Sequence, residues 1–327
     1  MNSKNIFLHD HAEFKTLVEV TAQAEKIVPY LVEKDYWLMH SIWGLQQFQL
    51  PFHLKGGTSL SKGYGIIHRF SEDIDVKIEP NEKLCGFKVF IGKNHDDVKH
   101  RSSRRDYFNW MRDYLNQNKN LLVPGISNIE RDINFDDAVK FRNGGIRFFY
   151  KSNFLTSPGV KEGILLEVGF DRTAPNQPCR ITSWVYERGS ALIKAIDNRA
   201  VNVPCYEPQY TFVEKLQAVV RKYRLYKEGS IGNLPANFIR HYYDIYQLID
   251  QPEVQAFIGT LEYENFKIER FGSDDTKISK SDAFQLTSLA DRQLFEKEYA
   301  RSESLYFKGR PSLEKILSRI GKDLNRL

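Results

Sequence analysis

Two aspartates separated by a single residue are the part of the sequence most suggestive of chemistry. Asp73 and Asp75 lie in the stretch SEDIDV, whose alternation of polar and apolar residues predicts a strand. Because strand side chains alternate between faces, both carboxylates should share one face, with Ile74 and Val76 buried on the other. Parallel carboxylates repel each other unless a cation lies between them, and Mg²⁺ prefers such oxygen ligands. The spacing therefore suggests a Mg²⁺ site, although two exposed aspartates on an edge strand would show the same pattern.

A glycine-rich turn precedes the aspartates by a short interval. Gly56 and Gly57 end the apolar segment FHLKGG, and Thr58 and Ser59 follow. Glycine lets the backbone approach a ligand closely, and a helix that begins here would direct free N–H groups and its positive dipole end toward an anion. With a Thr58 or Ser59 hydroxyl as an additional donor, we expect these residues to form an anion site that could hold a phosphate. The alternative is a capped helix after a tight turn, and the P-loop pattern GxxxxGK[ST] is absent.

A third acidic residue interrupts the apolar stretch GILLEVGF at 163–170. Strand alternation places Glu167 on the face of Leu165, opposite Leu166 and Val168. A buried carboxylate without a partner is costly or shifts its pKa, whereas a metal ion or a cation makes it tolerable. We therefore expect Glu167 to serve as a metal ligand or as a base. A salt bridge is the alternative, and Asp171, just past the strand, is the rival for this position.

The hydrophobic spacing predicts the elements that must position these residues. Helices are expected within 12–49, with a break near Pro29, and over 104–118, 211–226, 237–250, 282–299 and 311–327. Strands are expected at 52–57, 72–78, 87–92, 146–150, 163–170 and 181–186, and a polar loop at 266–281. The order predicts an α/β (α+β) fold, with a sheet-based catalytic domain over 1–205 that includes the N-terminal helices, a helical domain over 206–327 and a ligand cleft between them.

Composition describes an ordinary globular protein with a mild basic excess. The 327 residues are 41% hydrophobic and 27% charged, with a net charge of +5. Three widely spaced cysteines and an N-terminus without a signal-peptide pattern favour a cytoplasmic protein with no membrane partner. Basic residues gather at 100–105 and 215–227, where they could neutralise phosphates. The second stretch could hold an RNA backbone, with Tyr223 and Tyr226 available to stack on unpaired bases. A solvated basic helix face is the alternative for either stretch.

Four pieces of the sequence together resemble a known family. GGTSLSK followed by FSEDIDV is similar to the first motif of the DNA polymerase β-like nucleotidyltransferases. The closer resemblance is to the AbiEii/AbiGii toxin family, which includes the MenT-type toxins. It is carried by LVEKDYW at 31–37, LKGGTSLSKGYGIIHRFSEDIDV at 54–76, FVEKL at 212–216 and RHYYDIYQL at 240–248. The segment between 80 and 145 carries none of these pieces.

The resemblance implies a role for each matching residue. Gly57 and Ser59 would hold a nucleoside triphosphate, and Asp73 and Asp75 would bind Mg²⁺. Lys215 would contact the phosphates. Asp244 would complete the catalytic set, which then comprises Asp73, Asp75, Lys215, Asp244 and Glu167. The predicted nucleotide-binding residues are Gly56, Gly57, Thr58, Ser59, Lys215 and Arg240. From the sequence alone, Arg240 and Asp244 are four apart on a helix and could instead form a salt bridge with each other.

The function expected from this resemblance is Mg²⁺-dependent transfer of a nucleotide from an NTP to RNA. The expected acceptor is the 3′ end of tRNA, and the expected setting is a toxin–antitoxin or abortive-infection system that defends against phage, with a cognate antitoxin as partner. The alternatives are transfer to a small molecule or a protein, and an inactive module that binds nucleic acid or a partner. The pair Asp73 and Asp75 argues against a pure nucleic-acid binder, because clustered acids facing phosphate would oppose binding.

Overall fold

The computed structural model describes residues 6–48, 50–92, 94–156, 160–173, 175–233, 238–272 and 275–327. The chain divides into two compact units. The sheet unit comprises Met1–Tyr64 and Phe70–Tyr206, and the helical unit comprises Gly65–Arg69 and Glu207–Leu327. The short segment Gly65–Arg69, which lies between the glycine turn and the aspartate strand in sequence, therefore belongs to the helical unit.

A mixed sheet of seven strands, counted over the described residues, organises the sheet unit. The strand order is β3-β4-β5-β2-β1-β7-β6, with β2 parallel to β5, β1 parallel to β7 and the other neighbouring pairs antiparallel. This confirms the predicted mixed α/β class. The strands are β1 (Phe52–Lys55), β2 (Asp73–Ile78), β3 (Ile126–Asp132), β4 (Asn143–Tyr150), β5 (Ile164–Gly169), β6 (Asn176–Ile181) and β7 (Ala200–Tyr206).

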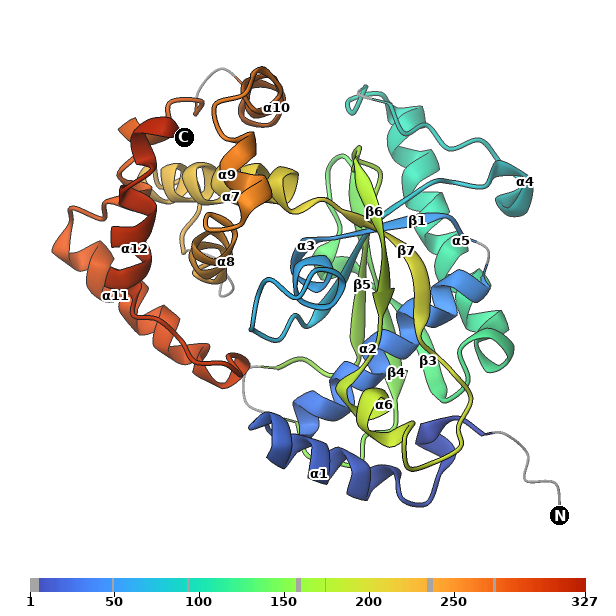
Figure 1. Ribbon diagram of the computed structural model, residues 1–327. Helices are drawn as coiled ribbons and strands as arrows, with labels where there is room; N and C mark the ends of the chain where they lie inside the picture. The colour runs from blue at the N-terminus through green and yellow to red at the C-terminus, as the bar shows by residue number, and fades with distance from the viewer. Residues whose placement is uncertain are drawn as a thin grey trace, which may run out of the picture. The chain divides into compact units, whose positions relative to one another are not determined.

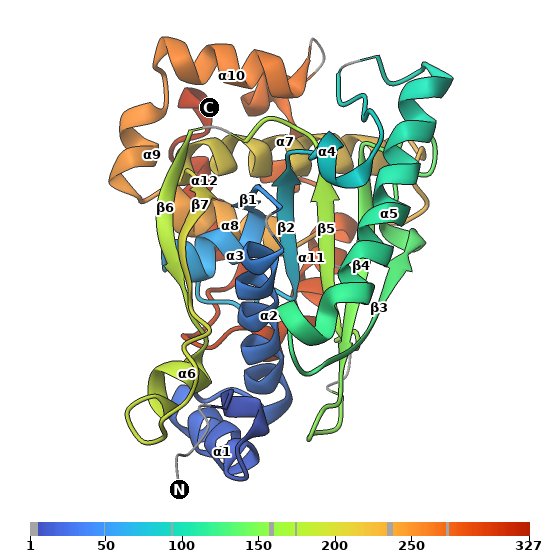
Figure 2. The ribbon, with the colours of Figure 1, turned by 90° about the vertical axis from the view of Figure 1, so that its right-hand side faces the viewer.

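Helices cover both faces of this sheet. Helices α2 and α5 pack on one face, and Figure 2 shows both in front of the strands. The short α3 packs against β2, on the side of the sheet away from α5 in Figure 1. Ile74 and Val76 of β2 and Leu166 and Val168 of β5 are fully buried, as the alternation predicted. The helices are α1 (Phe14–Glu25), α2 (Pro29–Gln47), α3 (Gly56–Thr58), α4 (Glu82–Cys85), α5 (Val98–Leu122) and α6 (Trp184–Gly189).

Several strand predictions in this unit are wrong or incomplete. The segment 87–92 is not a strand, because the guanidinium of Arg104 takes the backbone carbonyls of Phe90 and Gly92 that a ladder would have used. The segment 181–186 is the end of β6 followed by the start of α6. Strands β3 and β7 were not predicted. Strand β7 contains Pro204, opposite Pro178 of β6, and proline argues against a strand in the middle of a sheet.

The helical unit consists of the segment Gly65–Arg69 and of helices that the apolar spacing largely predicted. They are α7 (Pro208–Lys227), α8 (Arg240–Leu248), α9 (Pro252–Phe257), α10 (Leu261–Phe271), α11 (Leu289–Arg301) and α12 (Leu313–Gly321). The loop predicted over 266–281 is wrong at its start, where α10 continues to Phe271. Asn237, the first residue of the helix predicted over 237–250, lies outside the described residues, and the helix itself begins at Arg240. No helix in the described ranges has the length and apolar character that crossing a membrane requires.

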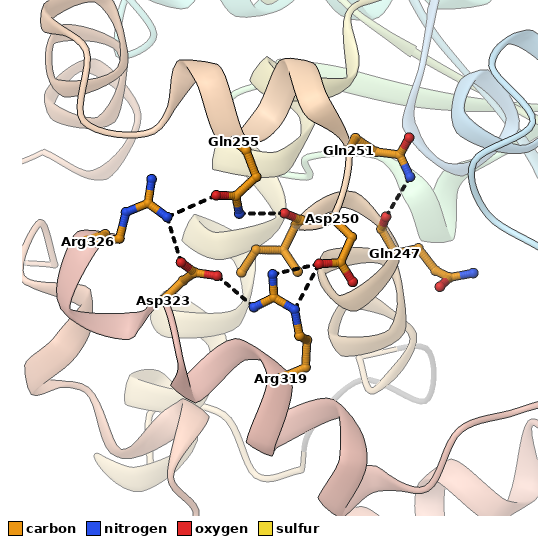
Figure 3. A network of polar contacts seen from close by, with 8 residues as sticks. Gln247, Asp250, Gln251, Gln255, Arg319, Asp323 and Arg326 are labelled. Atoms are coloured by element: carbon orange, nitrogen blue, oxygen red, sulfur yellow. Dashed lines mark hydrogen bonds and ion pairs between the residues drawn. The ribbon is translucent and has the colours of Figure 1, made fainter.

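Polar contacts tie the C-terminal end of α8 to the last helices (Figure 3). Arg319 of α12 donates to Asp250 at 2.9 and 2.6 Å and to Asp323 at 2.6 Å. Arg326 bridges Asp323 at 2.7 Å and the Gln255 side chain at 2.9 Å. These contacts restrain α8, the helix that carries Asp244.

Candidate functional site

The predicted acidic residues of the sheet unit meet in one row across neighbouring strands. Asp75 of β2 lies in register with Glu167 of β5 on one side and with Lys55 of β1 on the other. Asp73 is two residues before Asp75 and therefore shares its face of the sheet. Asp171, the rival of Glu167, follows the end of β5 and is exposed. The register thus places Glu167, rather than Asp171, beside the two aspartates.

The carboxylates in this row of residues disfavour one another's negative charge. Burial, and after it the negative charge of Asp75, raise the pKa of Glu167 to about 7, and the positive charge of Lys55 acts in the opposite direction. The Asn143 amide of β4 donates a hydrogen bond of 3.2 Å to Glu167 Oε1. Like charges in a partly buried row are relieved by a bound cation. The row is therefore suited chemically to a hard divalent ion.

The three carboxylates do not form a preformed cluster. Over the described ranges of the chain, no group of three or more His, Cys, Asp or Glu side chains is gathered closely enough to hold a metal ion. The oxygen donors of Asp73, Asp75 and Glu167 are nevertheless the type that Mg²⁺ prefers, and they share one face of two adjacent strands. Their chemistry fits this ion, and a triphosphate would supply its further ligands.

The glycine turn lies directly against the aspartate strand. Gly56 has a φ of +71°, and a Cβ atom at this position would lie 2.1 Å from Oδ2 of Asp75. Any side chain at residue 56 would therefore collide with the carboxylate, so glycine is required here for close approach as well as for conformation. The turn continues from α3 into a π-helix at Ser59–Gly63, a conformation that occurs frequently at functional sites.

The two hydroxyls of the turn are used inside the protein. Thr58 Oγ1 donates to the backbone carbonyl of Asp73 at 2.6 Å, and Ser59 Oγ donates to that of Tyr206 at 3.4 Å. Both residues are at most 1% exposed. Their hydroxyls stabilise the turn against β2 and β7 and are not directed at a ligand. An anion bound at this turn would be held by backbone N–H groups.

In the helical unit, Asp244 is the centre of a compact cationic cluster. Its carboxylate is fully buried and accepts two hydrogen bonds of 2.7 Å from Nε and Nη2 of Arg69. The ammonium of Lys215 lies 2.9 Å from Oδ2. Burial alone would raise the pKa of Asp244, but the charges of Arg69 and Lys215 outweigh it and hold this pKa well below its usual range. Two cations share one anion, so the cluster keeps a net positive charge.

A comparison with known families decides the identity of the chain. A family model described as "Nucleotidyl transferase AbiEii toxin, Type IV TA system" matches residues 37–319. The chain belongs to this family. It is therefore a nucleotidyl transferase and the toxin of a type IV toxin–antitoxin system, which implies an NTP substrate and an antitoxin partner. No curated protein and no solved structure matches the chain.

Each unit of this AbiEii-family toxin contains charged residues that the sequence alone did not reveal. Arg69 stands inside the quoted motif, but nothing in its spacing indicates that it pairs with Asp244, 175 positions away. Asp244 pairs with Arg69 and Lys215, and the salt bridge of Arg240 with Asp244 stays a prediction. Lys55 was read only as part of a short strand. The position of Lys55 directly before the two glycines could have indicated that it belongs to the site.

In the basic stretches 100–105 and 215–227, several side chains are buried or paired inside the protein and are not available to bind RNA. Tyr223 is 4% exposed and donates to Asp282 and Asp291 at 2.7 and 3.0 Å, so the expected stacking of this ring on bases is wrong. Arg224 and Lys227 form ion pairs with Asp275 and Asp291. In the stretch 100–105, Arg104 is 1% exposed and holds backbone carbonyls instead of phosphates.

Proposed function

We propose that this toxin transfers a nucleotide from an NTP to a hydroxyl group of an RNA, with Mg²⁺ as cofactor. The observation that carries the proposal is the meeting of three predicted site residues: Asp75 lies against Gly56 and in register with Glu167. A turn able to hold phosphates and a row of carboxylates that requires a cation are thereby adjacent within one unit. Nucleotidyl transfer requires this combination, because catalysis consists mainly of positioning and charge neutralisation.

Each residue then has a specific role. Asp73 and Asp75 would hold Mg²⁺, which when bound neutralises charge on the triphosphate. Backbone N–H groups of Gly57 and Thr58 would bind phosphate oxygens, whereas that of Ser59 is donated to the carbonyl of Gly56. The acceptor hydroxyl oxygen forms a bond to the α-phosphorus, the bond between this phosphorus and the oxygen of the β-phosphate breaks, and pyrophosphate leaves. Glu167, with a pKa of about 7, is suited to take the hydroxyl proton.

The proposed roles of Lys215 and Asp244 are electrostatic. Asp244 is saturated by Arg69 and Lys215, so it is unsuited to act as a base. Arg69 compensates the buried carboxylate with two hydrogen bonds and leaves the charge of Lys215 available to attract a phosphate. Arg240, 9% exposed, lies four residues before Asp244 on the same helix.

An exposed basic and aromatic surface of the sheet unit supports RNA as the acceptor. The ammonium groups of Lys88 and Lys99 each lie 5.1 Å from the centre of the Phe90 ring. This ring is stacked with that of His100 at a centroid distance of 4.7 Å. The buried guanidinium of Arg104 fixes the loop that carries Phe90. Cations beside partly exposed rings are typical of surfaces that bind unpaired nucleotides, such as those at the 3′ end of tRNA.

The decisive experiment incubates the purified toxin and Mg²⁺ with each α-³²P-labelled NTP in turn, plus total tRNA. The control is Asp73→Asn, which keeps the size of the side chain. Label on tRNA from one NTP, absent in the control and without Mg²⁺, is the expected result. Mg²⁺-dependent NTP binding without labelled RNA would indicate a small-molecule or protein acceptor. Absence of NTP binding would contradict the proposal and favour an inactive binding module.

A further inference from the structure

Helix α2 carries three consecutive charged residues that are withdrawn from solvent. Glu33, Lys34 and Asp35 are each at most 1% exposed. Such burial is rare for charged residues, because ionised groups lose their hydration in the interior. Consecutive helix positions point about 100° apart, so the three side chains reach different parts of the sheet unit. Two of these parts are the two segments that form the candidate site.

Asp35 holds the turn that follows the glycines. Its Oδ1 and Oδ2 lie 2.7 and 2.9 Å from the ammonium of Lys62, and Oδ2 also accepts the backbone N–H of Trp184 at 3.0 Å. The same ammonium lies 3.8 Å from the centre of the Trp184 ring. Lys62 belongs to the π-helix Ser59–Gly63. Its side chain is thus fixed from two sides, and with it the turn that begins at the phosphate-binding residues.

Lys34 acts on the other segment, at the start of β2. Its ammonium donates to the backbone carbonyl of Lys161 and lies 3.9 Å from a carboxylate oxygen of Glu72. Glu72 is 8% exposed and directly precedes Asp73. This ion pair therefore restrains the aspartate strand one residue before the first proposed Mg²⁺ ligand.

Glu33 provides an internal comparison, because its partners lie outside the site. It accepts hydrogen bonds from the Ser152 hydroxyl and from the backbone and side-chain N–H groups of Asn153, at 3.1 and 2.7 Å for the latter two. It is as buried as its two neighbours. A general effect of burying charge in α2 should therefore appear at Glu33 too, whereas an effect on the site should not.

We infer that Lys34 and Asp35 are positioning residues that set the separation between the phosphate-binding turn and the Asp73–Asp75 strand. The inference rests on the proposed function of that site. Both residues belong to one long helix, so the turn and the strand are held relative to a common frame. Accurate spacing matters, because a displacement of reacting groups by about 1 Å can slow a reaction about a hundredfold.

The first test separates positioning from charge balance with Asp35→Asn, Lys62→Gln and the double variant. Each single variant leaves a buried charge uncompensated and should lose stability in urea unfolding, with kcat at least about tenfold lower. The double variant removes both charges and should regain stability while kcat stays low, because the turn is no longer tied to α2. Recovery of kcat together with stability would show that the pair only balances charge, and would overturn the inference.

The matched control is Glu33→Gln, which should lower stability but leave kcat within about twofold of the wild type. Hydrogen exchange followed by mass spectrometry supplies a readout that needs no activity. Asp35→Asn should speed exchange in residues 56–64, and Glu33→Gln only around 152–153. Unchanged exchange in 56–64 in Asp35→Asn would overturn the inference. A wild type that transfers no nucleotide would instead refute the proposed function, and the exchange data would still decide whether Asp35 holds the turn.

Discussion

The acidic row of the sheet unit has an excess of negative charge, whereas the cluster around Asp244 in the helical unit has an excess of positive charge. In the sheet unit, Asp75 and Glu167 lie side by side on adjacent strands, and the pKa of Glu167 is raised to about 7. In the helical unit, Asp244 is held by two cations and its pKa lies well below the usual range. Both carboxylates are largely removed from water, so burial does not explain the difference; the sign of the neighbouring charges does. One centre is suited to bind a cation and the other an anion.

The largest effect is expected from Asp75→Asn. The variant removes a charge from the row that must hold the cation, so nucleotidyl transfer should fall about a thousandfold or more, which corresponds to roughly 4 kcal/mol. Initial rates at saturating NTP and Mg²⁺ measure the effect. The control is Asp113→Asn, an exposed aspartate of α5 paired with its neighbour Arg112, which should leave the rate within about twofold. Equal activity of Asp75→Asn and wild type would remove Asp75 from the proposed mechanism.

Replacing the anion of the other centre should chiefly destabilise the fold. Asp244→Asn leaves Arg69 and Lys215 buried without a counter-charge, and the free energy of unfolding should fall by about 3–5 kcal/mol. Because the folded-state pKa of Asp244 is depressed, its contribution is complete above the unfolded pKa of about 4 and is lost only in stronger acid. Urea unfolding at pH 5, 7 and 9 should therefore show the same loss. A loss that grows steadily across this pH range would contradict the assigned charges.

Because the acidic row has an excess of negative charge, Glu167→Gln should stabilise the toxin. With the folded-state pKa near 7 and the unfolded value near 4.5, the folded state binds the proton more tightly, so wild-type stability falls as pH rises between these values. Relative to wild type, the variant should gain about 1–3 kcal/mol at pH 8 and nothing near pH 4. Mg²⁺ with NTP should reduce the gain. The control is Asp171→Asn, whose exposed carboxylate should show no such pH dependence; a similar gain there would indicate only a change in net charge.

The smallest effect is expected at the network of Figure 3, which is far in sequence from the carboxylate row and restrains α8 only at its end. Arg319→Ala removes three partly exposed contacts with Asp250 and Asp323. Unfolding free energy should fall by about 1 kcal/mol or less, and the loss should shrink in high salt. An activity loss that exceeds the stability loss would show that the position of α8, and so of Asp244, depends on this network.

Local patterns predicted the elements that carry the site. Strand alternation at 73–78 and 163–170 correctly assigned the faces of Asp73, Asp75 and Glu167, because a side-chain period of two needs no tertiary information. Apolar spacing likewise predicted α2, α7 and α8. The prediction failed where a distant side chain competed with the local pattern. Arg104 donates hydrogen bonds to backbone carbonyls of the segment 87–92, which is therefore not a strand. Strands β6 and β7 form although each contains a proline.

The sequence by itself therefore determined the class of fold, the family, and which residue types are available for chemistry. Only the tertiary structure decided their partners. The register of β2 with β5 placed Glu167 beside Asp75, and folding brought Arg69 to Asp244 and Lys62 to Asp35. Strand register and long-range ion pairs depend on how whole elements pack, and the free energy of a charge depends on what surrounds it after packing. No spacing along the chain encodes those neighbours directly.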